Sequence, residues 1–110
     1  MTFEEYQKLT GETAIYPKDG GKNLVYTTLG MASESGEVAG KSKKVIRDKN
    51  GAIDEATRKE MSDEIGDVLW YVSQLSAELG LNLEDVASGN IEKLRSRKNR
   101  GKLPGSGDNR

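Results

Sequence analysis

The chain has 110 residues, of which 34% are apolar and 32% are charged, so we expect one domain with a small core. It contains no cysteine and no histidine, which excludes disulfides, thiol chemistry and the usual zinc sites. No apolar run approaches the roughly 20 residues that span a bilayer, and the acidic N-terminus is unlike a signal sequence, so we expect a cytoplasmic protein.

The formal net charge of −1 hides an asymmetry along the chain. Residues 1–89 contain 10 basic and 16 acidic side chains, whereas residues 90–110 contain 7 and 2, which leaves net charges of −6 and +5. An acidic body with a basic tail is typical of a nucleic-acid-binding arm. It also fits a site that holds metal ions on one wall and phosphates on the other.

A first helix is predicted over residues 2–14. Thr2 is the expected N-cap, and Glu5 follows three residues later, as in a capping box. Residues 16–23 then read as a loop, because Pro17 and a pair of glycines interrupt the pattern.

A second helix is predicted from about residue 23 to residue 48. Its spacing of apolar and small residues fits one helical face. Three glycines lie in this segment, and small residues allow two helix backbones to approach closely, so we interpret them as packing positions. The predicted face consists of Val25, Leu29, Ala32, Gly36, Ala39 and Ile46. The other two glycines of the segment are Gly30 and Gly40.

A long third helix is predicted to begin after its N-cap Asp54 and to end at Gly80. A last helix runs from residue 83 or 84 to about residue 100, and residues 101–110 have turn chemistry. Four helices without a strand signal, joined by short loops, predict an all-α fold resembling a four-helix bundle. The third helix carries an apolar stripe of Met61, Ile65, Val68, Val72, Leu75 and Leu79.

Two acidic pairs stand at helical spacing on neighbouring helices. Glu34 and Glu37 project from one face of the second helix, and Glu64 and Asp67 from one face of the third. The second pair lies beside the apolar stripe, where an uncompensated carboxylate is costly. A divalent cation would compensate it, and all-oxygen ligands favour Mg²⁺ or Mn²⁺. Glu60 is expected to face solvent.

Two other interpretations of these residues stay open. The acidic pairs are consistent with a solvated surface on a purely structural bundle. Residues 93–102 would suit a helical protein that binds nucleic acid or a partner through a basic arm, with a strong dependence on salt. The net charge of −6 over the first 89 residues argues against nucleic acid, since this body would repel a duplex.

The acidic motifs resemble those of the MazG-like nucleoside triphosphate pyrophosphohydrolases, an all-α superfamily. Its pattern, Glu-Glu-x-x-Glu followed by Glu-x-x-Asp, is matched by "SESGE" and "EIGD", with Ser33 in place of the first glutamate. The resemblance extends over "GEVAGKSKKVIRDKNG", "DEIGDVLWYVSQLSAELGL" and the basic tail, or roughly residues 16–110. The substitution at Ser33 removes one acidic group and leaves open which glutamate is the general base.

The resemblance implies a single domain over residues 1–110, with a basic, glycine-rich tail at 101–110. It implies Mg²⁺-dependent cleavage of ribo- or deoxyribonucleoside triphosphates between the α and β phosphates, which yields a monophosphate and pyrophosphate. Alternatives within the superfamily are a phosphoribosyl-ATP pyrophosphohydrolase and a dUTP or dCTP hydrolase. A homodimer or homotetramer is expected, with no membrane association. The implied catalytic residues and metal ligands are Glu34, Glu37, Glu64 and Asp67.

Basic residues are expected to meet the triphosphate, because phosphoryl transfer depends on positioning and charge stabilisation. Asn90, Lys93 and Arg97 share one helix face and match the family's Asn-x-x-Lys helix. Lys44 and Arg100 complete the expected substrate-binding set. Two aromatic residues, Trp70 and Tyr71, follow the second acidic pair by one turn; we interpret Trp70 as a packing residue rather than a base-stacking one.

Overall fold

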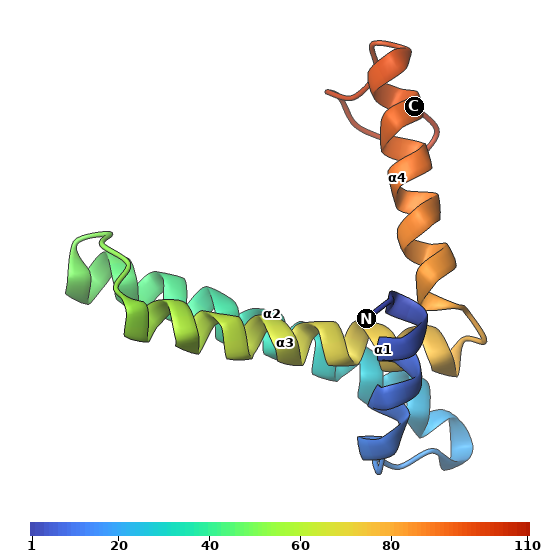
Figure 1. Cartoon of the computed structure of the whole chain (residues 1–110), viewed down its shortest axis with the longest axis horizontal. Helices are drawn as coiled ribbons and strands as arrows, with labels where there is room; N and C mark the ends of the chain where they lie inside the picture. Colours follow the sequence, from blue (N-terminus) through green and yellow to red (C-terminus); the bar gives the residue numbers. More distant parts are fainter.

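The structure is a computed structural model of residues 1–110, and every regular element is helical (Figure 1). Four α-helices are joined by short turns, which confirms the predicted all-α class. Two 3₁₀ turns, Gly11–Thr13 and Asp19–Gly21, lie between the first two helices. The α-helices are α1 Phe3–Thr10, α2 Lys22–Lys49, α3 Glu55–Glu78 and α4 Leu83–Asn99.

The helix ends follow from local side-chain chemistry. Thr2 caps α1 by accepting a hydrogen bond from the Glu5 amide, and Asp54 caps α3 by accepting one from the Thr57 amide. Both caps satisfy amide groups that have no partner inside the helix. Gly80 follows α3 with a φ of 70°, a left-handed conformation that favours glycine.

Helices α2 and α3 form a long hairpin in which the two helices lie side by side along most of their length (Figure 1). Helix α1 packs across α3 at the open end of this hairpin. The contact between α1 and α3 is polar: the Thr10 and Ser73 hydroxyls lie 2.8 Å apart, and the Gln74 amide donates to Thr10. No buried side-chain nitrogen or oxygen lacks a partner, so these polar residues are well satisfied.

Helix α4 projects away from the hairpin and touches the rest of the chain mainly at its first turn (Figure 1). Gln7 fixes this turn, because its amide donates to the Leu81 carbonyl and accepts from the Leu83 amide. The radius of gyration is 16.9 Å. A compact chain of this length has about 13 Å, so the bundle is open within one copy of the chain.

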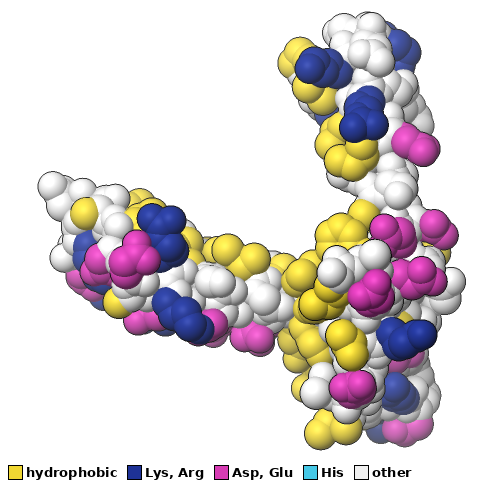
Figure 2. Space-filling model, in the orientation of Figure 1, with side chains coloured by type: hydrophobic (Ala, Val, Ile, Leu, Met, Phe, Trp, Pro, Cys, Tyr) yellow, Lys and Arg dark blue, Asp and Glu magenta, His cyan; other side chains and the backbone are white.

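The open shape leaves little apolar core. Only 10 of 110 residues are buried, and Tyr16, Val45 and Leu83 are the apolar ones among them. The apolar face predicted for α2 is exposed instead, with Leu29 64% and Ile46 74% accessible. Figure 2 shows hydrophobic side chains along the sides of the hairpin and of α4 that face each other across the angle between them. This face lacks a covering element in the single chain.

The glycines of α2 differ in their surroundings. Only Gly30 lies against another helix, whereas Gly36 and Gly40 have open space where a side chain would be. The expectation that all three serve close helix packing is therefore wrong for two of them within the chain.

Candidate active site

Three of the four predicted carboxylates converge at the middle of the hairpin. Glu34 projects from α2, while Glu64 and Asp67 stand one turn apart on α3. One oxygen from each lies within 4.8 Å of the others. The spacing of three residues on α3 and the antiparallel course of α2 are sufficient to bring them together. Glu37 lies one turn further along α2, is exposed, and stands outside this group.

The carboxylate cluster carries uncompensated negative charge. Glu34 and Glu64 are half-buried, and no lysine or arginine of the chain forms an ion pair with any of the three acids. Burial, and then the charges of Asp67, Glu64 and Glu37, raise the pKa of Glu34. A site of this kind gains from a cation that neutralises it.

The donor set fits a hard divalent cation. All three groups offer carboxylate oxygens, which Mg²⁺ and Mn²⁺ prefer. Mg²⁺ ligands lie about 2.1 Å from the ion, so ligands on opposite sides are about 4 Å apart. The present oxygens, which lie within 4.8 Å of one another, are close to that spacing. Glu60, one turn before Glu64, is not part of this group and pairs instead with Lys41 of α2 at 3.5 Å.

An aromatic cavity opens beside the cluster. Its volume is about 360 Å³, and Glu34 and Asp67 form part of its lining. Trp70 and Tyr71 form another wall, with their rings in an edge-to-face arrangement and their centroids 5.0 Å apart. The Trp70 indole N–H donates a 2.8 Å hydrogen bond to the hydroxyl of Thr13, which also lines the cavity. Trp70 therefore contributes to this cavity as well as to packing.

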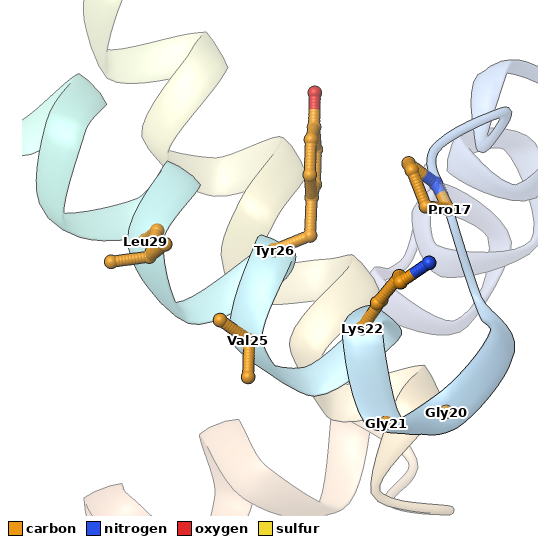
Figure 3. A pocket seen from close by; sticks show the side chains of 7 residues that line it. All are labelled: Pro17, Gly20, Gly21, Lys22, Val25, Tyr26 and Leu29. Atoms are coloured by element: carbon orange, nitrogen blue, oxygen red, sulfur yellow. The ribbon is translucent and has the colours of Figure 1, made fainter.

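A second hollow, of about 280 Å³, lies where α2 begins (Figure 3). The Tyr26 ring stands between Pro17 on one side and Leu29 on the other. The Tyr26 ring is stacked on Tyr16, with 5.3 Å between centroids. No acidic residue lines this hollow, so it lacks the ligands for a divalent cation. The lining residues are Pro17, Gly20, Gly21, Lys22, Val25, Tyr26 and Leu29.

The predicted substrate-binding residues do not reach the carboxylates within one chain. Lys44 is exposed on α2 ten residues beyond Glu34, a distance of about 15 Å along the helix axis. Asn90 and Lys93 are exposed on α4, which projects away from the hairpin (Figure 1).

The two remaining predicted residues, Arg97 and Arg100, bind the C-terminal tail. Arg97 is only 7% accessible and donates to the Asp108 carbonyl, and Arg100 donates to the Arg110 carbonyl and the Ser96 hydroxyl. Residues 101–110 thus fold back on the end of α4. Their backbone and the two guanidinium groups are engaged with each other in this arrangement.

Thr13 is the lining residue for which the sequence offers no signal, since it lies 57 positions from Trp70 and in a 3₁₀ turn. Tyr71 is visible in the sequence by its position one turn after Asp67. No helix of the structure combines the length and the apolar character required to cross a membrane.

Comparisons with known proteins identify the family to which the sequence is similar. Residues 25–101, which include all four predicted carboxylates, match the MazG nucleotide pyrophosphohydrolase domain. A protein of Mycobacterium phage L5, named gene 37 protein, is 46% identical over 114 aligned positions that cover the whole of both chains. No solved structure matches the chain.

Proposed function

The chain belongs to the MazG nucleotide pyrophosphohydrolase family, and we propose that it hydrolyses ribo- or deoxyribonucleoside triphosphates between the α and β phosphates. The products are a nucleoside monophosphate and pyrophosphate. The convergence of Glu34, Glu64 and Asp67 within 4.8 Å, without a cation of the chain to neutralise them, carries this proposal. Identification of both products by ion-exchange chromatography tests it.

Glu34, Glu64 and Asp67 are the proposed ligands for Mg²⁺, with Mn²⁺ as a substitute of the same ligand preference. A bound divalent ion supplies charge stabilisation to the phosphates and lowers the pKa of water. The residues of the chain orient the ion and the triphosphate beside the aromatic cavity. No cysteine or histidine is present to form a covalent intermediate, which supports direct attack by water.

Glu37 is the proposed general base. It stands one turn from Glu34 and outside the group of three, so its carboxylate stays free when the others bind a metal. In the hydrolytic step it accepts a proton from the attacking water while the anhydride bond between the α and β phosphates breaks. Ser33, which replaces the family's first glutamate, cannot take this role because a hydroxyl is not a base near neutral pH.

We propose that the working form is a homodimer or a dimer of dimers. The apolar faces of the hairpin and of α4 are exposed in one chain, and burial of apolar surface is worth about 25 cal/mol per Å². A second copy is the partner whose own apolar face matches this one.

Such an assembly also explains why the basic side chains expected to bind phosphate do not lie beside the carboxylates of their own chain. Lys93 and Asn90 lie on an arm that stands away from the carboxylates of its own chain (Figure 1). We propose that they meet the phosphates at the site of the partner copy. The alternative of nucleic-acid binding has less support, since Arg97 and Arg100 bind the chain's own tail.

A further inference from the structure

Gly30 of α2 lies directly against the Tyr71 ring of α3. A Cβ atom at this position would lie 2.1 Å from Cε1 and 2.4 Å from Cζ of Tyr71, far inside van der Waals contact. No comparable conflict exists at any other glycine of the chain, and Gly36, Gly40 and Gly66 have nothing within 4 Å. The missing side chain at Gly30 therefore creates a notch, and the Tyr71 ring fills it.

The notch adjoins the carboxylate cluster on both helices. Glu34 follows Gly30 by one turn on α2, and Tyr71 follows Asp67 by one turn on α3. Tyr71, Glu34 and Asp67 all line the aromatic cavity. The position of the Tyr71 ring therefore sets the shape of the cavity that borders the proposed metal ligands.

The Tyr71 ring has aromatic neighbours besides the notch. The Trp70 ring meets it in the edge-to-face arrangement already described, and Trp70 is itself held by Thr13. The centroid of Tyr26 lies 6.3 Å from that of Tyr71. Tyr71 is half-buried, so a ring expelled from the notch leaves its present place against these neighbours and moves into the cavity or toward solvent.

We propose that Gly30 is a positioning residue of the substrate site: it seats Tyr71 as a wall of the aromatic cavity and so fixes where the nucleotide lies relative to the metal-binding carboxylates. This proposal rests on the proposed function, because it takes a nucleotide as the ligand. Gly30 acts through Tyr71 and does not itself touch the substrate.

Gly30→Ala tests the notch, and Gly40→Ala is the matched control on the same helix. The affinity of each variant for the Mg²⁺ complex of α,β-methylene-ATP is measured by the fluorescence of Trp70, the single tryptophan. KM for triphosphates and the affinity for Mg²⁺ alone are measured in parallel. We expect Gly30→Ala to weaken analogue binding and raise KM by about tenfold or more, with Mg²⁺ affinity unchanged, and Gly40→Ala to match the wild type.

A second pair of variants separates positioning from folding. Tyr71→Ala removes the ring that a methyl group at position 30 would strike, so Gly30→Ala should lower the melting temperature in the wild-type background but not in the Tyr71→Ala background. The double variant should bind the analogue no more weakly than Tyr71→Ala alone. An additional loss in the double variant would show that Gly30 does not act through Tyr71 and would overturn the proposal.

The remaining outcomes separate this inference from the proposed function. If Gly30→Ala binds the analogue as the wild type does and has the same KM, Gly30 does not position the substrate site. A parallel loss of Mg²⁺ affinity would overturn that role as well. In both cases the proposed hydrolysis stands. Analogue binding that depends on Gly30 without turnover of any triphosphate supports the notch and contradicts the proposed function. Absence of any nucleotide binding by the wild type overturns both.

Discussion

The Asn23 amide, at the start of α2, donates a 2.8 Å hydrogen bond to a carboxylate oxygen of Glu78, at the end of α3. The Tyr16 hydroxyl, from the loop after α1, donates to the other oxygen of the same carboxylate. Lys18 lies 3.7 Å from it. A single acidic side chain therefore joins three segments at the open end of the hairpin, close to the aromatic residues that border the proposed site.

Glu78→Gln should lower stability at neutral pH. Hydrogen bonds from Tyr16 and Asn23, and then the Lys18 charge, hold the pKa of Glu78 below its ordinary value. A depressed pKa stabilises the folded state above the unfolded-state pKa, about 4.3, and this contribution is lost as the pH falls through the lower folded-state value. We expect a loss of about 1–3 kcal/mol at pH 7 that shrinks as the pH falls below about 4.3, measured by urea unfolding across pH. A loss that stays the same as the pH falls would contradict this.

Mg²⁺ should stabilise the wild type against heat, but not Glu64→Gln. Binding to the native state alone adds about 2.7 kcal/mol when the metal is at 100 times its Kd. Glu60→Gln is the matched control, because Glu60 stands one turn away on the same helix and pairs with Lys41. Differential scanning fluorimetry with and without Mg²⁺ gives the comparison. Equal Mg²⁺ shifts in both variants would show that the three carboxylates do not bind the ion.

The exposed apolar face predicts an effect of Ile46→Lys on assembly. A surface substitution of this kind in a monomer changes stability by about 0.5 kcal/mol or less. On an interface it places a charge in an apolar contact, so the oligomer should dissociate at micromolar concentration. Ile15→Lys serves as control, since Ile15 is 94% accessible and lies in the loop before α2, outside the two helices of the hairpin. Light scattering that shows a fully active wild-type monomer would contradict the prediction.

A site shared between copies predicts complementation. Glu64→Gln removes a proposed metal ligand and Lys93→Gln a proposed phosphate ligand, so each variant alone should lose most of its activity. A mixed dimer contains one native site out of two, and half of the dimers are mixed under random assembly. The whole mixture should therefore recover up to about a quarter of wild-type activity. Activity is measured after co-refolding. No recovery, with mixed oligomers demonstrated, would place both residues in the same chain's site.

Local chemistry explains why the helices could be predicted so closely. Thr2 and Asp54 mark helix starts through their own side chains, and Gly80 marks an end through its backbone. The two acidic pairs could be placed on helix faces for the same reason. Long-range features could not: the bond between Thr13 and Trp70 spans 57 positions, and its partners carry no sequence signal of pairing.

The apolar periodicity of α2 indicated a buried face, yet Leu29 and Ile46 are exposed in the single chain. A periodic pattern reports that a face is apolar and does not report what covers it. The sequence did not predict the projection of α4 away from the hairpin, because short loops alone do not fix the direction in which a helix leaves its neighbours.

The most direct test of the central claim is product analysis by ion-exchange chromatography. The wild type and Glu64→Gln are incubated with a panel of ribo- and deoxyribonucleoside triphosphates, with Mg²⁺ or with EDTA. We predict equal amounts of monophosphate and pyrophosphate from at least one triphosphate, abolished by EDTA and reduced at least about 100-fold in the variant. Orthophosphate as the product, turnover that survives EDTA, or no turnover of any triphosphate would contradict the account.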